Sequence, residues 1–286
     1  RTGGRGRAGP VPDPGAGAGT VAAMQQRSTF DLAAERVVRA LALFGFLPGM
    51  VVAVVVALLV GPVLGLVALL VVAGAWAAVV VVRARGAVDR VLAATGARPI
   101  GPEELARWRN VVDGMSVTSG VGGAELWVLD RPEANALSVA GRDRAVLVVT
   151  RGLVEQLGVV ELEGVAANLL GRVRDGSARY GTVTVGLLGP FLGKLDQAGK
   201  VVAEGLGDQR SVRSDLVAVD MTRYPPGLAD ALAELSRIGT AVPGVDPATA
   251  HLWVAPVVEG EVGVDPAVAE TAQQPLSYRI ALLQEL

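Results

Sequence analysis

The order of apolar and polar residues divides the chain into a polar start, one long apolar run and a mixed remainder. Residues 40–82 contain no charged side chain. A single membrane span needs about 20 apolar residues, so this run is long enough for two spans. Gly61 and Pro62 lie near its middle and predict a turn there. We therefore expect a hairpin with transmembrane helices at about 40–60 and 63–82.

Arginines flank the apolar run on both sides. Arg36 and Arg39 precede it, and Arg83, Arg85 and Arg90 follow it. Because basic residues are enriched beside spans on the cytoplasmic side, both ends of the hairpin are expected in the cytoplasm. The chain is then a multi-pass protein of the inner or plasma membrane, with the lipid bilayer as a partner and a cytoplasmic body. The alternative, a buried hairpin of a soluble protein, is disfavoured because soluble helices rarely lack charge over such a length.

Shorter patterns after the hairpin indicate a mixed fold. Helical spacing with early acidic residues predicts a helix over 101–115. Apolar strands are expected to end at Asp130 and Thr150, and residues 151–176 have the spacing of a short helix followed by a longer one. This order of helix, small sheet and helices predicts an α+β domain over 86–286.

The amino-acid composition adds predictions about the N-terminus and about the partners of the chain. Residues 1–30, before the hairpin region at 31–85, are rich in Gly, Pro and Ala, which predicts a disordered tail. Met24 in this tail is a candidate for the natural start. The chain is 51% hydrophobic and 19% charged, which is typical of a protein that lies partly in lipid. Its 26 basic and 28 acidic residues nearly balance, so nucleic acid is not expected as a partner.

Few side chains are suited to metal or nucleophilic chemistry. Cysteine is absent and histidine occurs once, at His251. Catalytic zinc is usually held by three protein ligands, of which two or more are commonly His, so no zinc and no other cofactor is expected here. The candidate nucleophiles lack a Gly-x-Ser-x-Gly context and would depend on that one His as base. These candidates are Ser138, Ser177, Ser211 and Ser214.

Several stretches in one order resemble a known family. They are the strand ending in Asp130, "NALSVAG" at 135–141, "VVTRGLVEQL" at 148–157, "ELEGVAANLLGRVRDG" at 161–176, and the later "DMTRYPPGLADALAELSRI" and "PLSYRIALLQEL". Together they resemble the HtpX-like membrane zinc metallopeptidases, which are related to the CAAX prenyl proteases. The resemblance covers about residues 37–286. It implies a mainly helical zincin domain of the gluzincin type, with a small sheet, behind a membrane hairpin.

The resemblance also implies where the zinc site would be. In the family, a His-Glu-x-x-His helix supplies two zinc ligands and the general base, and a later Glu is the third ligand. In this chain the corresponding positions are Asn168, Leu169, Arg172 and Ser211. A supporting Asp of the family falls at Ser177, and only a second one, Asp215, is retained. The chain is therefore expected to be a degenerate member that lacks the motif and the metal.

The loss of a dication would leave Asp215 uncompensated, which is costly for a buried carboxylate. We hypothesise that Arg172 replaces the metal as a structural cation and pairs with Asp215 or with the nearby Asp175, so these three residues form a structural remnant of the site. The alternative is that Arg172 points to solvent or to lipid phosphates.

Two further stretches allow a functional and a structural interpretation. The first corresponds to the family's substrate-pairing edge strand and contains Asn135, Ala136, Leu137, Ser138 and Val139. An edge strand can bind an extended peptide without catalysis, unless its own chain blocks the edge. The second stretch, 182–195, is too short to span, and an interfacial segment is favoured over a buried helix. Trp127 and Trp253 are expected in the core rather than in a ligand site.

These patterns favour a catalytically inactive, membrane-anchored metallopeptidase homologue that acts in peptide or protein binding, in scaffolding or in regulation of an active relative. The expected partner is a peptide or a membrane protein, and the oligomeric state is left open. One alternative is a membrane zinc endopeptidase with an atypical site, which the family resemblance alone would imply. The other is a purely structural membrane protein.

Overall fold

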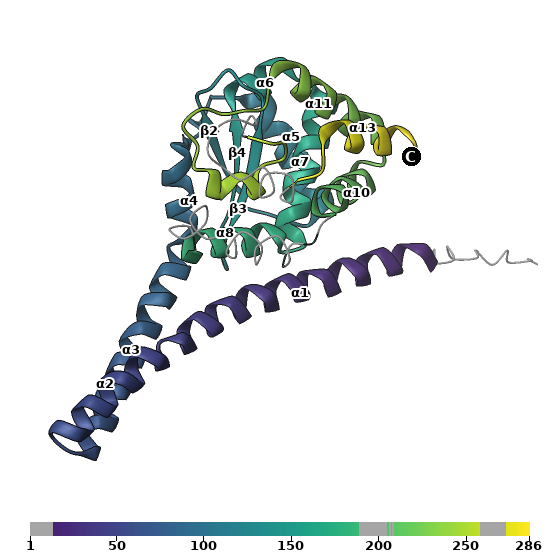
Figure 1. The fold of residues 1–286 in the computed structure, drawn as a ribbon. Coiled ribbons are helices and arrows are strands. Elements are labelled where there is room, and N and C mark those ends of the chain that lie inside the picture. The colour runs from purple at the N-terminus through teal and green to yellow at the C-terminus, as the bar shows by residue number, and fades with distance from the viewer. Residues whose placement is uncertain (1–13, 189–204, 206, 208, 258–272) are drawn as a thin grey trace, which may run out of the picture.

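The computed structural model describes residues 14–188, 205, 207, 209–257 and 273–286. Figure 1 shows a helical arm that projects from a body of helices around a small sheet. The arm consists of α1 (Pro14–Phe44), α2 (Phe46–Leu59) and α3 (Pro62–Arg85). It joins the body through α4 (Ala87–Thr95).

The arm contains the predicted hairpin. The helix α2 ends at Leu59 and α3 begins at Pro62, and Gly61 between them has a φ of 136°, so the predicted turn is confirmed. Within the described residues, two helical stretches, Thr29–Leu59 and Pro62–Arg85, are long and apolar enough to cross a membrane. Only 11% and 17% of their most apolar windows are buried, whereas a core helix of a soluble protein would be mostly buried. This exposure favours lipid as their surroundings.

A tryptophan fixes the bend between α1 and α2. At the bend, the Gly45 amide donates to the Ala42 carbonyl instead of continuing the α-helical pattern. The Trp76 indole of α3 donates to the Leu41 carbonyl, at 2.7 Å. A Cβ at Gly45 would lie 2.3 Å from Trp76 Cδ1, so only glycine allows this approach. The bend and the contact between the helices therefore depend on each other.

The start of α1 differs from the sequence prediction. Residues 14–30 were expected in a disordered tail, but α1 begins at Pro14, and residues 1–13 lie outside the described part. Phe30 and Ala34 of this helix are buried in a cluster with Tyr180 of the body. Packing of this kind stabilises a helix whose Gly-rich sequence has low intrinsic propensity.

The body confirms the predicted α+β class. Its sheet has the order β1-β2-β4-β3, in which β2 and β4 are parallel and the other pairs antiparallel. The strands are β1 (Arg98–Pro99), β2 (Glu125–Leu129), β3 (Ala136–Ala140) and β4 (Ala145–Thr150). The helices of the body are α4, α5 (Ala106–Ser119), α6 (Arg151–Gln156), α7 (Val159–Arg174), α8 (Ser177–Leu188), α10 (Arg210–Thr222), α11 (Pro225–Ile238), the 3₁₀ helix η1 (Pro247–Leu252) and α13 (Leu276–Gln284).

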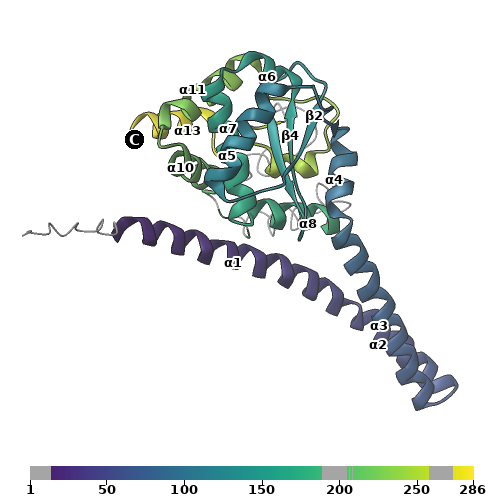
Figure 2. The same cartoon turned by 180° about the vertical axis from the view of Figure 1, so that it is seen from behind.

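Helices cover both faces of the sheet, as Figures 1 and 2 show from opposite sides. Leu147 and Val149 of β4 belong to the core cluster that contains α5, α7 and α11, whereas Val146 and Val148 belong to the cluster with α4 and Trp253. Alternate residues of a strand point to opposite faces, so a strand between two layers must be apolar at every position. Trp253 is buried, which confirms it as a core residue, whereas Trp127 is half-buried and packs against the same cluster.

The stretch 182–195 was expected to be an interfacial segment rather than a buried helix, but its described part, 182–188, is a buried helix. Thr182 and Thr184 are fully buried within α8, and residues 189–195 lie outside the description. Val183 and Leu187 form a cluster with Val80 of α3. Residues 182–188 are therefore core, and they connect the body to the arm.

Candidate functional site

The helix α7, where the resemblance places the zinc motif, lies in the centre of the body. Close packing makes it inaccessible, because glycines let neighbouring helices approach. A Cβ at Gly164 would lie 2.9 Å from the backbone of Leu228 in α11, and one at Gly171 would lie 2.7 Å from Val217 in α10. The motif positions Asn168, Leu169 and Arg172 are exposed by only 1%, 0% and 5%.

The retained carboxylate, Asp215 of α10, is fully bonded. Arg279 of α13 binds it bidentately, with Nε to Oδ2 and Nη2 to Oδ1 both at 2.7 Å. The Asn168 amide also donates to Oδ1, at 2.9 Å. Both members of the ion pair are 1% exposed. The carboxylate that would support a metal site therefore joins three helices through an arginine and an amide.

Arg172 does not pair with Asp215 or Asp175, so this part of the sequence prediction is wrong. It is buried, which also excludes the solvent-facing alternative, and its Nη1 and Nη2 donate to the Leu252 and His251 carbonyls at 2.8 and 2.9 Å. Burial, and then repulsion by Arg279, lower the pKa of Arg172 to about 10. The planar fork of Arg279 already occupies both oxygens of Asp215, so Arg172 bonds to the free carbonyls of η1.

Asp175 and the serines of the region have structural partners. Asp175 ends α7 and accepts a hydrogen bond from the Ser177 amide at 2.8 Å, and burial raises its pKa. Ser214 donates to the Arg210 carbonyl within α10, and Ser211 is buried one turn before Asp215. The Ser177 and Ser214 hydroxyls thus donate to helix carbonyls, and Ser211 is buried within α10.

His251 is placed as a structural side chain. Its Nε2 donates to the Gly181 carbonyl at 3.2 Å. Burial, and then the nearby charge of Arg210, lower its pKa to about 3, so the imidazole is neutral at ordinary pH. In the described part of the chain, no hydrogen bond joins it to any of the four candidate nucleophiles. A serine-histidine arrangement is therefore not formed.

The donor set does not fit zinc. The Leu169 side chain has no ligand atom, and three arginines of this region, Arg172, Arg210 and Arg279, are buried near one another. Repulsion from the other two arginines adds to burial in lowering the pKa of Arg210. Among the residues that the structure describes, no group of three or more His, Cys, Asp or Glu side chains could hold a metal ion. Positive charge at this centre opposes the binding of a dication.

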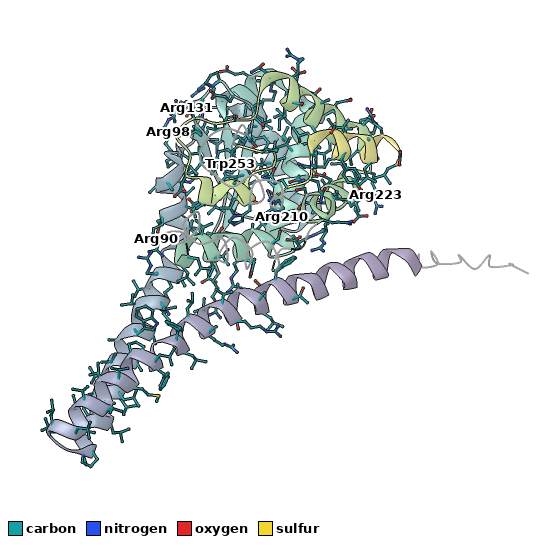
Figure 3. All side chains as sticks on the ribbon, in the orientation of Figure 1. Arg90, Arg98, Arg131, Arg210, Arg223 and Trp253 are labelled. Atoms are coloured by element: carbon teal, nitrogen blue, oxygen red, sulfur yellow. The ribbon has the colours of Figure 1, made fainter. Side chains whose placement is uncertain are left out.

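Two buried arginines of this region, Arg210 and Arg279, were not among the site residues expected from the sequence. Figure 3 places Arg210 inside the body, and it is 4% exposed. A signal for Arg279 was present, since the C-terminal stretch "PLSYRIALLQEL" was part of the family resemblance. Its pairing with Asp215, which lies 64 residues away, could not be read from the sequence.

The strand β3 is at the edge of the sheet, but the chain itself covers it. The Val254 amide donates to the Ala136 carbonyl at 2.8 Å, and Leu137 and Trp253 form an antiparallel bridge. The Asn135 amide adds hydrogen bonds to Thr240 and Ala255 backbone carbonyls. The residues expected to form an accessible peptide edge, Asn135, Ala136, Leu137, Ser138 and Val139, are all 0% exposed. The prediction of an open edge is wrong, and the alternative of an edge blocked by its own chain holds.

Known proteins include distant relatives of this chain. No family model matches the chain. A Protease HtpX homolog of Dictyoglomus thermophilum is 28% identical over 210 residues, which cover 59% of this chain and 67% of that protein. A second, of Tropheryma whipplei, is 29% identical over 194 residues, or 56% and 66% of the two chains. The chain is a distant homologue of the HtpX proteases.

The homology implies a zincin-like domain and, with the two apolar helices, indicates a membrane protein. A third HtpX homolog, of Pelotomaculum thermopropionicum, is 24% identical over 237 residues, which cover 69% of this chain and 82% of that protein. The matched part spans about two thirds of the length of the first relatives. At this similarity the chemistry has to be judged from the residues at the site.

We expect Arg172→Met to lower the free energy of unfolding by about 1–2 kcal/mol. Two buried carbonyls would lose charged donors, and the removal of a buried charge beside Arg279 would offset part of that loss. The measurement is thermal unfolding in a mild detergent at pH 7.5. Arg131→Met, at an exposed arginine, is the control, with an expected change within about 0.5 kcal/mol. Equal Tm values for the two variants would refute a structural role for Arg172.

Proposed function

We propose that the chain is a catalytically inactive, membrane-anchored homologue of the HtpX proteases that acts by binding a protein partner. One observation carries the loss of catalysis: the centre of the family site is filled by the buried cluster of Arg279, Asp215 and Asn168. A catalytic metal ion polarises a water molecule only if one of its coordination positions is open to that water. At this centre Asp215 instead accepts hydrogen bonds from Arg279 and Asn168.

The retained architecture supports a binding role. The zincin-like core is closely packed around α7, and the arm holds the body beside the membrane. Because β3 is covered, the proposed partner is not an extended peptide on that strand. A membrane protein, such as an active protease of the same family, is the partner class that suits an arm with an exposed apolar surface.

Zinc analysis tests the loss of catalysis. The full chain, purified in detergent, should contain less than about 0.1 zinc per chain by elemental analysis. EDTA should leave its Tm unchanged, and casein should remain uncleaved. An active HtpX-type protease, purified in the same way, is the positive control. About one zinc per chain together with casein cleavage would replace this proposal by an atypical zinc endopeptidase.

Regulation is tested by reconstituting an active HtpX-type protease in vesicles with and without the full chain. We expect the rate of casein cleavage to change about twofold or more, because binding shifts the population of competent protease. An unchanged rate, with both proteins shown to be inserted, would favour a purely structural membrane protein.

We also propose that the body lies in the cytoplasm, which the arginines beside the spans support. The chain has no cysteine, so a single Val117→Cys substitution at a position that is 85% exposed gives a clean label site. In intact cells it should resist a membrane-impermeant maleimide and react only after lysis. Labelling before lysis would place the body on the opposite side.

A further inference from the structure

An open cleft of about 1140 Å³ lies where the arm meets the body. Its lining comes from α1, α3, the start of α4, the turn between β3 and β4, and α8. This junction lies beside Arg90 in Figure 3, at the base of the body. The cleft is separate from the buried cluster around Asp215, and neither catalysis nor the family site uses it.

The cleft is rich in positive charge. Its lining contains five arginines and three acidic residues: Arg39, Arg85, Arg142, Arg144, Arg179, Glu35, Asp89 and Asp143. Three of the arginines have an acidic partner, since Arg39 pairs with Glu35, Arg144 with Asp89, and Arg179 with Asp31. In the described part of the chain, no hydrogen bond or ion pair involves the side chain of Arg85 or Arg142. Two guanidinium groups in the lining are therefore available for a ligand.

The rest of the lining is apolar. Val38 of α1, Val81 of α3 and Val183 of α8 contribute to it, and Val81 lies within the charge-free run of the hairpin. Arg39 and Arg85 flank that run, so they lie at the level where a bilayer changes from hydrocarbon to headgroups. The cleft thus places the unpaired Arg85 next to apolar walls at the headgroup level, and the unpaired Arg142 lines the same cleft from the body.

We propose that this cleft binds the headgroup of an anionic membrane phospholipid, with Arg85 and Arg142 as ligands of its phosphate. Arginine forms charge-assisted, bidentate hydrogen bonds with phosphate, and a basic pocket beside transmembrane helices suits an anionic lipid headgroup. The apolar walls accommodate the glycerol end of the acyl chains. Arg142 comes from the β3–β4 turn and Arg85 from α3, so a bound lipid joins the body to the arm.

The test uses the full chain in dodecyl maltoside and a fluorescent phosphatidylglycerol as the probe. We expect phosphatidylglycerol to bind at least about tenfold more tightly than phosphatidylcholine, equivalent to about 1.4 kcal/mol. Arg85→Gln with Arg142→Gln should abolish this preference. Arg131→Gln with Arg223→Gln, which removes two exposed arginines away from the cleft, should preserve it.

The other outcomes of the lipid-binding test would overturn the proposal. Equal binding of the two lipids, or a preference that survives in the Arg85→Gln, Arg142→Gln variant, overturns the proposal. Displacement of the probe by millimolar inorganic phosphate at constant ionic strength shows a site for a soluble anion, and it overturns the lipid assignment as well. Both arginines are exposed and make no described contact, so the variant should keep its Tm. The single Arg142→Gln variant, expected to weaken the preference, tests the proposal again if the double variant is unstable.

Discussion

Replacement of Arg279 by methionine is expected to lower the free energy of unfolding by about 3–5 kcal/mol. Asp215 would remain buried at 1% exposure with only the Asn168 amide as a donor, and removal of one member of a buried pair costs about this much. The Val254 carbonyl would also lose its donor, Arg279 Nη1. For a body of this size, Tm should fall by roughly 6–20 °C. The measurement is thermal unfolding in detergent, followed by tryptophan fluorescence.

A double variant separates the unpaired charge from the loss of packing. Arg279→Met combined with Asp215→Leu removes both charges, and replacement of a whole buried ion pair by apolar side chains is often neutral or stabilising. The double variant should therefore be more stable than the Arg279→Met single variant. If it is less stable, or if the single variant changes Tm by less than 2 °C, roughly the effect of 1 kcal/mol, the pair does not carry the stability of the site.

Patterns with local causes were predictable from the sequence. The turn at Gly61 and Pro62 and the strands before Asp130 and Thr150 follow from periodicity and turn residues. The start of α1 was not predictable, because its helix is supported by contact between Phe30 and the body. Local composition contains no information about such a contact.

The sequence alone shows which residues stand at the motif positions of the candidate site. It does not show which side chains pair with Asp215 and Arg172. Asn168, Leu169 and Arg172 are all on α7, as the spacing predicts. The new counterion of Asp215 comes from α13, and the partners of Arg172 are carbonyls of η1. Both are long-range contacts, which depend on how helices pack rather than on residue type. The covered edge of β3 has the same origin.

His251 should make the protein sensitive to acid, with a loss of about 3 kcal/mol between pH 7.5 and pH 4.5. Its folded pKa, about 3, lies below the ordinary value of 6.5 because the imidazole is buried. Below pH 6.5 the unfolded chain binds a proton that the folded chain does not bind, so acidification favours unfolding. The loss grows by about 1.4 kcal/mol per pH unit from pH 6.5 down to the folded pKa.

The comparison with His251→Gln isolates this contribution. Glutamine does not titrate and retains an amide that can donate to the Gly181 carbonyl, and His251 is the only histidine in the chain. The Tm of the natural chain should fall between pH 7.5 and pH 4.5 by roughly 6–12 °C more than that of the variant. Carboxylates contribute equally to both proteins and cancel in the difference. Parallel pH curves would mean that the imidazole is protonated in the folded state, which would require an acceptor beside it in place of the surrounding arginines.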